Sequence, residues 1–336
     1  MPVPPRVSVL LPVRDAAPTL GECLDSLGAQ TLADHEVVAV DDGSTDATRS
    51  LLTDHARRDP RLRVLTTPPR GLVAALNAGL LAARAPLVAR MDADDVAHPE
   101  RLALQAERLL TDPLTDVLGC RVELLGGARN RGMRAYVDWL NTLLDHDAIV
   151  RDLFVESPLA HPSVVLRTVA LRRLGGYRDF AGPEDYDLWL RAREAGLRFA
   201  KCPETLLAWR DPPNRLTRTD PRYASERFRA LKLAALARGP LVPGRPVVIW
   251  GAGPIGKSWA RALRGAGHVV AAFIEVDARK IGETIHGAPV VPVARSGAFR
   301  GALHLAAVGQ AGARARIREE AERLGLVDRG DLIAVA

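Results

Sequence analysis

Short apolar, β-branched stretches alternate with helical patterns over residues 7–92, and this alternation constrains the fold more than any other feature of the chain. The predicted strands lie at residues 7–13, 36–42, 62–66 and 86–92, and the predicted helices lie between them at 19–29, 46–57 and 72–84. This order predicts an α/β domain built on a mainly parallel sheet. In such sheets, ligands bind at the carboxyl ends of the strands.

Acidic residues follow three of these strands at that same edge. Asp15 follows the first strand, Asp41 and Asp42 follow the second, and the segment RMDADD at 90–95 ends the fourth. Crowded carboxylates repel one another, and their strongest use is to bind a hard divalent cation that also contacts phosphate oxygens. Mg²⁺ or Mn²⁺ suits such ligands, whereas Zn²⁺ would call for His or Cys nearby.

Both acidic clusters also have a purely structural interpretation. Asp95 or His98 can cap a helix that begins at Pro99, and Asp46 can cap the helix that follows the turn VDDGSTD. Two acidic strand ends in one sheet nevertheless favour ligand binding over capping alone. Asp42 can in addition accept a hydrogen bond from a ring N–H of a nucleobase.

A third acidic pair lies further along the chain, in the segment GPEDYDLWLR. Glu184 and Asp185 stand at the start of a predicted helix, where free backbone N–H groups and the helix dipole would keep a carboxylate ionised. The alternative is that both are ordinary acids of a first helical turn. His161 precedes a predicted strand at 163–167 and has an equally plain alternative as a structural hydrogen-bonding residue.

Five segments occur in a fixed order over roughly residues 6–210: LLPVRDAAPTLGECLDSLGAQT, VVAVDDGSTDAT, GLVAALNAGLLAARAPLVARMDADD, HPSVVLR and GGYRDFAGPEDYDLWLRAREAG. Together they resemble family 2 glycosyltransferases of the GT-A fold. The resemblance implies transfer of a sugar from a nucleotide-diphosphate donor, with inversion at the anomeric carbon and with Mg²⁺ or Mn²⁺ as cofactor.

The resemblance also implies roles for individual residues. Asp94 and Asp92 are the expected metal-site residues, with Asp94 as the direct ligand and Asp92 near both the metal and the ribose. Asp185 is the expected catalytic base, with Glu184 orienting donor or acceptor. Arg14 replaces the aromatic or other uncharged residue of many relatives. The residues expected at the donor nucleotide are Pro12, Arg14, Asp15, Asp42, Asn77, Asp92 and His161.

A second α/β unit is predicted after a Pro- and Gly-containing stretch. The expected limits are a GT-A glycosyltransferase domain at 1–215, a helical linker at 216–243 and a small Rossmann-like nucleotide-binding domain at 244–336. VVIWGAGPIGK and FIEVDARKIGETIHGAPVV resemble the nucleotide-binding N-terminal domain of bacterial sugar acyltransferases. The candidate residues for a UDP-sugar or a dinucleotide are Gly251, Gly253, Gly256 and Asp277. The alternative is a docking domain whose glycines only make the turn.

Composition narrows the function further. Aromatic residues make up only 4% of the chain and the net charge of +6 is diffuse, so no nucleic-acid module is indicated. No stretch reads as a membrane span or a signal peptide, which predicts a cytoplasmic protein or one at the inner face of the membrane, with at most peripheral association. Three scattered cysteines indicate neither a disulfide framework nor a zinc site.

The leading interpretation is an enzyme that moves a single sugar from a UDP-sugar to a carbohydrate or lipid-linked acceptor in surface polysaccharide synthesis. The membrane helices and the Gln/Arg-x-x-Arg-Trp motif of processive synthases are missing, which favours single addition. One alternative is an NAD-dependent oxidoreductase of sugar nucleotides acting through the C-terminal domain, although no Tyr-x-x-x-Lys motif is present. Another is a non-catalytic sugar-nucleotide-binding protein.

Overall fold

The computed structural model describes residues 4–126, 131–213, 215–310 and 312–336, and the chain divides into two compact α/β units. The first unit comprises the residues up to Val150 together with Pro158–Pro221, and the second comprises Arg151–Ser157 and Arg222–Ala336. The predicted limits lie at 215 and 243, whereas the structural division falls between Pro221 and Arg222. The sequence also gives no sign that Arg151–Ser157 belongs with the C-terminal residues.

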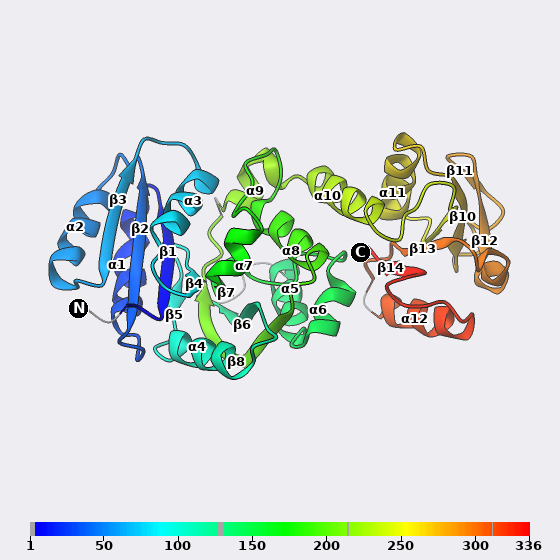
Figure 1. Cartoon of the computed structure of the whole chain (residues 1–336). Coiled ribbons are helices and arrows are strands. Elements are labelled where there is room, and N and C mark those ends of the chain that lie inside the picture. Colours follow the sequence, from blue (N-terminus) through cyan, green and yellow to red (C-terminus); the bar gives the residue numbers. More distant parts are fainter. Residues whose placement is uncertain (1–3, 127–130, 214, 311) are drawn as a thin grey trace. The chain divides into compact units, whose positions relative to one another are not determined.

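The first unit is built on one eight-stranded sheet in the order β3-β2-β1-β4-β7-β6-β8-β5 (Figure 1). β1 runs parallel to β2 and β4, and β2 runs parallel to β3. β7 is antiparallel to both β4 and β6. The strand bounds are β1 Val7–Val13, β2 His35–Asp42, β3 Leu62–Thr67, β4 Leu87–Arg90, β5 Val96–Ala97, β6 Val117–Leu124, β7 Val165–Arg167 and β8 Phe199–Trp209.

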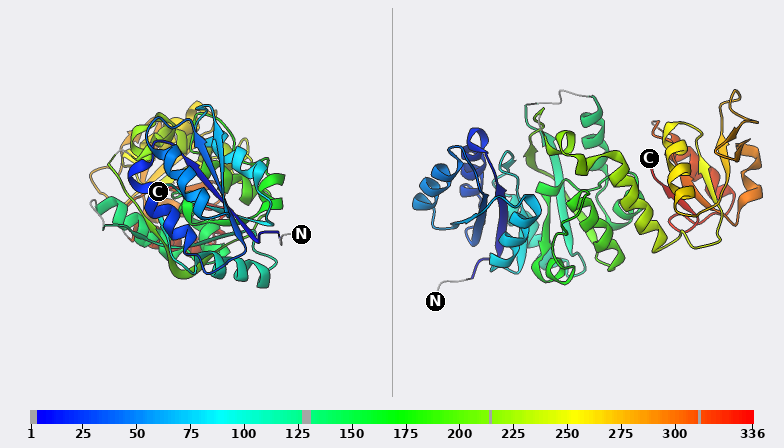
Figure 2. Two further views of the ribbon diagram at one scale, coloured as in Figure 1. Left: turned by 90° about the vertical axis from the view of Figure 1, so that its left-hand side faces the viewer. Right: turned by 90° about the horizontal axis from the view of Figure 1, so that it is seen from above.

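Helices cover both faces of this sheet, which is why β1 and β2 are buried along their whole length (Figure 2). Alternate residues of β1 pack with Leu20 and Leu24 of α1, while Ala75 of α3 packs on Val38 and Val40 on the other face. The helices of this unit are α1 Ala17–Gly28, α2 Thr48–Arg58, α3 Leu72–Ala82, α4 Arg101–Thr111, α5 Arg131–Thr142, α6 His146–Asp152, α7 Thr168–Arg173, α8 Glu184–Glu194 and α9 Leu216–Thr219, with 3-10 turns η1 His161–Ser163 and η2 Pro221–Tyr223 at the unit's end.

The predicted elements of residues 7–92 are present with small shifts at their ends. The shift that matters for the site is at β4, which ends at Arg90, so that the acidic segment after it leaves the sheet. The helix predicted from Pro99 begins at Arg101. The ring of His98 accepts the N–H of Glu100 at 3.3 Å at this helix entrance, whereas Asp95 makes its hydrogen bond to another element.

The second unit has a six-stranded sheet in the order β11-β12-β10-β9-β13-β14, parallel except at β11. Val155, from the segment Arg151–Ser157, packs on its core, and its carbonyl accepts Nζ–H of Lys232 at 2.8 Å. The strands are β9 Val247–Trp250, β10 Val270–Glu275, β11 Thr284–Ile285, β12 Ala288–Pro292, β13 Leu303–Ala306 and β14 Leu332–Ala334, and the helices are α10 Ser225–Ala237, α11 Pro254–Gly265, η3 Val293–Phe299 and α12 Ala313–Arg323.

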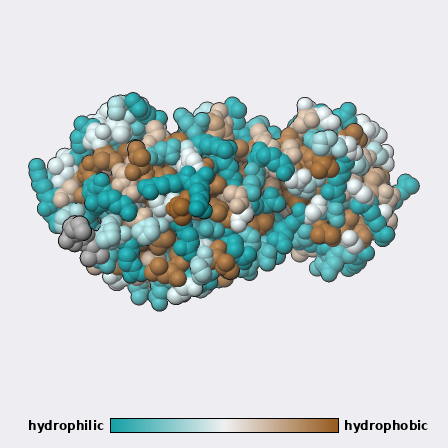
Figure 3. Space-filling view, in the orientation of Figure 1, coloured by the Kyte–Doolittle hydropathy of each residue, from teal (hydrophilic) through white to brown (hydrophobic). Residues whose placement is uncertain are grey.

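Among the described residues, no helix has the length and apolar character needed to cross a bilayer. On the face shown in Figure 3, hydrophilic and hydrophobic residues are interspersed. Single exposed apolar residues such as Leu81 and Val276 are ordinary on a protein surface.

Candidate active site

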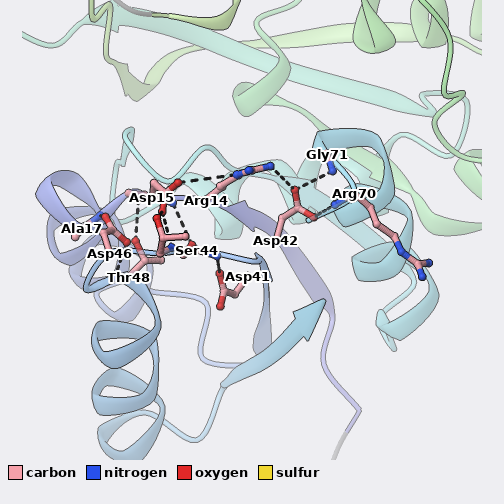
Figure 4. A network of polar contacts seen from close by, with 12 residues as sticks. Arg14, Asp15, Ala17, Asp41, Asp42, Ser44, Asp46, Thr48, Arg70 and Gly71 are labelled. Carbon is pink, nitrogen blue, oxygen red and sulfur yellow. Dashed lines mark hydrogen bonds and ion pairs between the residues drawn. The ribbon is translucent and has the colours of Figure 1, made fainter. Parts of the chain in front are cut away.

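The loops that follow β1 and β2 are tied together by side-chain hydrogen bonds (Figure 4). Asp15 has a left-handed backbone with φ of 46°, and its carboxylate accepts the N–H of Thr45 at 2.7 Å. Its own N–H donates to Oγ of Ser44 at 3.0 Å. Asp41 accepts the N–H of Ser44 and Nε–H of Arg49, both at 2.9 Å. These two aspartates therefore shape the edge of the sheet where Pro12 lies buried within β1.

Asp42 holds the start of α3. Its two carboxylate oxygens accept the backbone N–H groups of Arg70 at 2.7 Å and Gly71 at 2.8 Å. Gly71 has φ of 89°, a conformation that favours glycine. Nη1 of Arg14 lies 3.6 Å from Oδ2 of Asp42, so the guanidinium reaches from the end of β1 to the end of β2 (Figure 4). A contact between Asp42 and a nucleobase stays a prediction, as does one from Arg14.

Asp46 has the structural role that its position suggests. One of its oxygens accepts the N–H of Thr48 at the start of α2 at 2.9 Å, and the other accepts the N–H of Ala17 at the start of α1 at 3.1 Å. It therefore joins two helix starts, and the latter half of VDDGSTD is architectural.

Asp92, Asp94 and Asp95 form a compact carboxylate cluster directly after β4, with one oxygen of each within 4.8 Å of the others. Burial, followed by the charge of Asp92, raises the pKa of Asp94 to about 6. Burial and both neighbouring carboxylates raise the pKa of Asp95 well above its ordinary value. Oδ1 of Asp95 accepts the N–H of Arg210 at 2.8 Å, and its buried Oδ2 has no hydrogen-bond partner among the described residues.

This cluster fits a hard divalent cation. All of its potential ligands are carboxylate oxygens, the donor type that Mg²⁺ and Mn²⁺ prefer. The orphaned oxygen of Asp95 and the raised pKa of Asp94 indicate that burial and mutual repulsion outweigh the positive charges nearby. A cation bound here would relieve this repulsion.

The sequence does not indicate that two arginines act on the cluster. Arg90, at the end of β4, is only 2% exposed, and its Nη1 lies 2.5 Å from Asp92. Arg215 stacks on Trp209 with its guanidinium 4.1 Å from the ring centroid. The positive charges of both arginines lower the pKa of Asp94 and of Asp185 against the larger effects that raise them. The same two positive charges therefore act on both carboxylates.

Glu184 and Asp185 begin α8, as the sequence predicts. The expectation that a helix start keeps the carboxylate ionised is wrong for Asp185. Burial, followed by the charge of Glu184, raises its pKa to about 7. The hydrogen bond that Asp185 accepts from the N–H of Tyr186 at 2.7 Å acts in the opposite direction but is outweighed.

His161 lies buried next to this acidic pair. Its Nδ1 is 3.8 Å from Oε1 of Glu184, its Nε2 is 3.0 Å from the hydroxyl oxygen of Tyr177, and its ring meets Trp189 edge-on. Burial, with the charge of Arg90, lowers the pKa of His161 well below its ordinary value. The imidazole is therefore neutral, and direct contact between His161 and a donor stays a prediction.

Asn77 is committed to the protein backbone. Its Nδ2–H donates to the carbonyl of Tyr177 at 2.8 Å, and its Oδ1 accepts the N–H of Tyr177 at 3.0 Å. The structure thus gives Asn77 the task of fixing Tyr177, and contact with the donor, which the family resemblance implies, stays a prediction.

The glycine-rich loop of the second unit joins β9 to α11. Gly251 has φ of 99°, and a Cβ added at Gly256 would lie 1.9 Å from the carbonyl oxygen of Gly251. A Cβ added at Gly253 would meet no described atom within 4 Å. Glu275, rather than Asp277, contacts this loop by accepting the N–H of Ala252 at 2.9 Å.

Asp277 instead pairs with Arg279 at 2.8 Å. The sequence could have favoured Glu275, because it is the last residue of the strand, whereas Asp277 lies beyond its end. Nucleotide binding by this loop stays a prediction.

Comparisons with known proteins bear on the first unit. The model of the family described as glycosyl transferase family 2 matches residues 8–134. The amylovoran biosynthesis glycosyltransferase AmsE of Erwinia amylovora is 33% identical over 190 residues, which are 56% of this chain and 69% of AmsE. The uncharacterized glycosyltransferase EpsJ of Bacillus subtilis is 37% identical over 119 residues, so the match spans 34% of this chain and only 33% of EpsJ.

Two solved structures share the fold of this chain. Staphylococcus aureus TarS 1–349 in complex with UDP-GlcNAc has a TM-score of 0.56 at 20% identity, over 69% of this chain and 67% of that one. The mannosyltransferase PcManGT of Pyrobaculum calidifontis, in complex with GDP-Man and Mn²⁺, has a TM-score of 0.54 at 23% identity, over 79% of this chain and 80% of that one. The first unit accordingly has the GT-A fold.

Proposed function

Since the chain belongs to glycosyl transferase family 2, we propose that it moves one sugar from a nucleotide-diphosphate donor to a hydroxyl group of a carbohydrate or lipid-linked acceptor, with inversion at the anomeric carbon. The observation that carries this proposal is the compact carboxylate cluster of Asp92, Asp94 and Asp95 that follows β4. The arginines that act on Asp94 also act on Asp185, a half-buried carboxylate whose pKa is raised to about 7.

The cation site supports a metal-dependent reaction. Asp94, with Asp92 and Asp95, would hold Mg²⁺ or Mn²⁺ beside the donor phosphates. A cation bound there neutralises the charge that develops on the leaving diphosphate. The Mn²⁺ present in the PcManGT complex supports the same assignment, without deciding between the two ions.

Asp185 supplies the base. In its ionised form it takes the proton of the acceptor hydroxyl while the acceptor oxygen bonds to the anomeric carbon and the bond from that carbon to the diphosphate oxygen breaks. A base with a pKa of about 7 is well matched to this step at neutral pH. Glu184 orients the reacting groups beside it. A single displacement from the face opposite the leaving group inverts the anomeric centre.

A UDP-sugar is the donor we propose, and surface polysaccharide synthesis is the setting. Support comes from TarS, whose structure contains UDP-GlcNAc, and from AmsE, which is named for the biosynthesis of amylovoran. The GDP-Man in PcManGT makes a GDP-sugar the alternative donor. The nucleobase of the donor would lie at the edge formed by Arg14 and Asp42, with Pro12 and Asp15 beside it.

Two other functions compete with this one. An oxidoreductase would use the loop at Gly251 and Gly253, and a non-catalytic sugar-nucleotide sensor would keep ligand binding without needing Asp185. The sensor is disfavoured by the raised pKa of this half-buried carboxylate, a feature typical of catalytic groups.

Thermal unfolding of the full-length protein tests the proposal. UDP, GDP, NAD and S-adenosylmethionine are each added with and without Mn²⁺, to wild type and to Asp94→Ala. A ligand at about 100 times its Kd adds roughly 2.7 kcal/mol of stability. We expect UDP to stabilise only with Mn²⁺, and only the wild type. Stabilisation by NAD alone, unaffected by Asp94→Ala, would overturn the proposal.

A further inference from the structure

Three side chains from separate elements form a line of polar contacts that ends at the acidic pair. Tyr177, which follows α7, places its hydroxyl oxygen 3.0 Å from Nε2 of His161, and Nδ1 on the other side of that ring faces Oε1 of Glu184 at 3.8 Å. All three residues are buried. Buried polar groups are usually hydrogen-bonded, so the protons of this line determine which of its contacts are favourable.

Burial determines the protonation state of Tyr177 and of His161. Burial raises the pKa of Tyr177 and lowers that of His161, so the phenol keeps its proton and the imidazole is neutral. A neutral imidazole has one N–H donor and one acceptor nitrogen. Two arrangements remain, which differ in whether Tyr177 donates to Nε2 or accepts from it.

The carboxylate decides between them. If Tyr177 accepted from Nε2–H, the lone pair of Nδ1 would face Oε1 of Glu184, and two acceptors would oppose each other in a buried space. If Tyr177 donates to Nε2, the ring proton is on Nδ1 and the positive end of the N–H bond faces the carboxylate. The second arrangement makes the hydrogen bond between Tyr177 and His161 and directs Nδ1–H toward Oε1 of Glu184, 3.8 Å away.

We propose that Tyr177 is a positioning residue, whose hydroxyl donates to Nε2 of His161, fixes the ring as the Nδ1–H tautomer and thereby orients the Glu184 carboxylate beside the catalytic base. The role of Glu184 in this statement rests on the proposed function. The Nδ1–Oε1 separation of 3.8 Å is longer than a hydrogen bond, and contacts of this kind commonly tighten when substrate binds.

The surrounding structure holds Tyr177 in place for this role. Both polar groups of its peptide are bound by Asn77 of α3, and the carbonyl of Gly176 accepts Nη2–H of Arg191 at 2.9 Å. Arg191 is in turn paired with Asp187 at 2.6 Å. The residue is therefore clamped from α3 and from α8, the helix that carries the acidic pair, so its hydroxyl and Glu184 share one frame.

The tautomer can be measured directly in the full-length protein labelled with ¹⁵N at its histidine rings. The chain has 8 histidines, and the spectrum of His161→Gln identifies the resonances of His161. Long-range ¹H–¹⁵N correlations distinguish a protonated from an unprotonated ring nitrogen. We expect a protonated Nδ1 and an unprotonated Nε2. A protonated Nε2 in the wild type would overturn the proposal, whatever the activity of the enzyme.

Tyr177→Phe removes the hydroxyl and keeps the ring. In this variant the Nδ1–H tautomer should lose its preference, and kcat should fall on the order of 10-fold, a size typical of losing an outer partner of a functional histidine, with the donor Kd unchanged. Tyr223→Phe, in the second unit, makes the same chemical change outside the line of Tyr177, His161 and Glu184 and should alter neither. A Tyr177→Phe enzyme with wild-type tautomer and kcat would also contradict the proposal.

The NMR measurement needs no turnover. It therefore decides the tautomer even if no sugar donor is transferred, or if Tyr177→Phe does not fold. Failure of the proposed function and failure of this inference are thus separate results.

Discussion

The side-chain amide of Asn77 binds both the N–H and the carbonyl of Tyr177, a residue one hundred positions later in the chain. Through this pair, α3, whose start is held by Asp42, fixes the segment that approaches His161. An asparagine within an otherwise apolar helix is therefore part of the frame of the candidate active site.

Two adjacent glycines test this frame. Gly175 and Gly176 have φ of 78° and 68°, so alanine is strained at both positions. A Cβ at Gly176 would also lie 2.6 Å from Oδ1 of Asn77, whereas one at Gly175 meets no described atom within 4 Å. We expect Gly175→Ala to cost about 1 kcal/mol of unfolding free energy and Gly176→Ala more, with a fall in kcat only for the latter. Urea denaturation and steady-state kinetics measure both. Equal effects of the two substitutions would contradict the clamp.

The activity should depend on pH through the acidic pair. Asp185 acts as a base only when ionised, and its pKa is raised to about 7, so kcat/KM should rise with pH and level off above about 7. The apparent value belongs to the coupled pair with Glu184. Asp185→Asn should lower kcat by roughly 10² to 10⁴ and remove this limb of the profile. Exposed Asp138 offers the matched control, Asp138→Asn, which should keep the wild-type profile. A flat wild-type profile from pH 5.5 to 8, roughly the range around that pKa, would exclude Asp185 as the base.

Removing one carboxylate from the cation site should stabilise the metal-free protein. The pKa of Asp94 is raised to about 6, above its ordinary value of 3.8, so the ionised form weakens the fold as pH rises through that interval. At pH 8, Asp94→Asn should therefore unfold at a higher temperature than wild type in the presence of EDTA, and it should gain nothing from Mn²⁺. Asp54→Asn, at an exposed ion pair, is the control. A lower melting temperature for metal-free Asp94→Asn would show that the cluster is not under electrostatic stress.

A buried acid far from the site should govern acid stability. Glu36, which is 2% exposed, accepts hydrogen bonds from Ser8 at 2.7 Å, Arg84 at 2.8 Å and Arg63 at 2.8 Å. Burial alone would raise its pKa, but these bonds lower it from 4.5 to about 2. The ionised carboxylate thus contributes stability that is complete above pH 4.5 and is lost as pH falls to about 2.

Glu36→Gln should accordingly lower the free energy of unfolding by on the order of 3 kcal/mol at neutral pH. It should also reduce the loss of stability as pH falls from 4.5 to about 2. Glu107→Gln, at an exposed position of α4, serves as the control. Chemical denaturation at several pH values gives the result. An unchanged acid dependence in Glu36→Gln would refute the assignment.

The second unit offers a probe for its predicted ligand. Gly253 has φ of −82°, which any residue adopts, and an added Cβ meets no described atom within 4 Å. Gly253→Ala should therefore leave the fold intact and block only a ligand whose phosphates approach the loop. If NAD or a UDP-sugar binds there, calorimetric titration should show affinity in wild type and a loss of at least about 10-fold in the variant, since a lost contact of 1.4 kcal/mol has that effect. Unchanged affinity in Gly253→Ala would place the ligand elsewhere.

Much of the first unit follows from local rules. The strands and helices of residues 7–92 are predictable because buried strands of a parallel sheet are continuously apolar and α1 presents Leu20, Leu24 and Leu27 on one face. The acidic strand ends are equally visible in the sequence, and the structure places Asp92, Asp94 and Asp95 in one cluster.

The remaining features depend on partners distant in sequence. In the sequence, Arg90 is a lone charge in a strand. In the structure, the negative charges of Asp92 and of Glu184 on α8 stabilise its buried guanidinium. Asp185 obeys the helix-start rule in position but not in pKa, because burial and Glu184 outweigh the backbone donors. For Asn77, the unexpected amide is visible, but its partner Tyr177 is not.

The short segment Arg151–Ser157 has a consequence for how such proteins can be recombined. It is encoded within the first unit, yet Val155 packs on the core of the second, and the carboxylate of Asp152 pairs with Arg318 of α12. A single crossover near codon 221 would join the C-terminal residues of one protein to the segment Arg151–Ser157 of another, although this segment belongs to the same compact unit. Exchange of the C-terminal unit among relatives therefore requires two coordinated crossovers, or compensating changes at Val155 and Asp152.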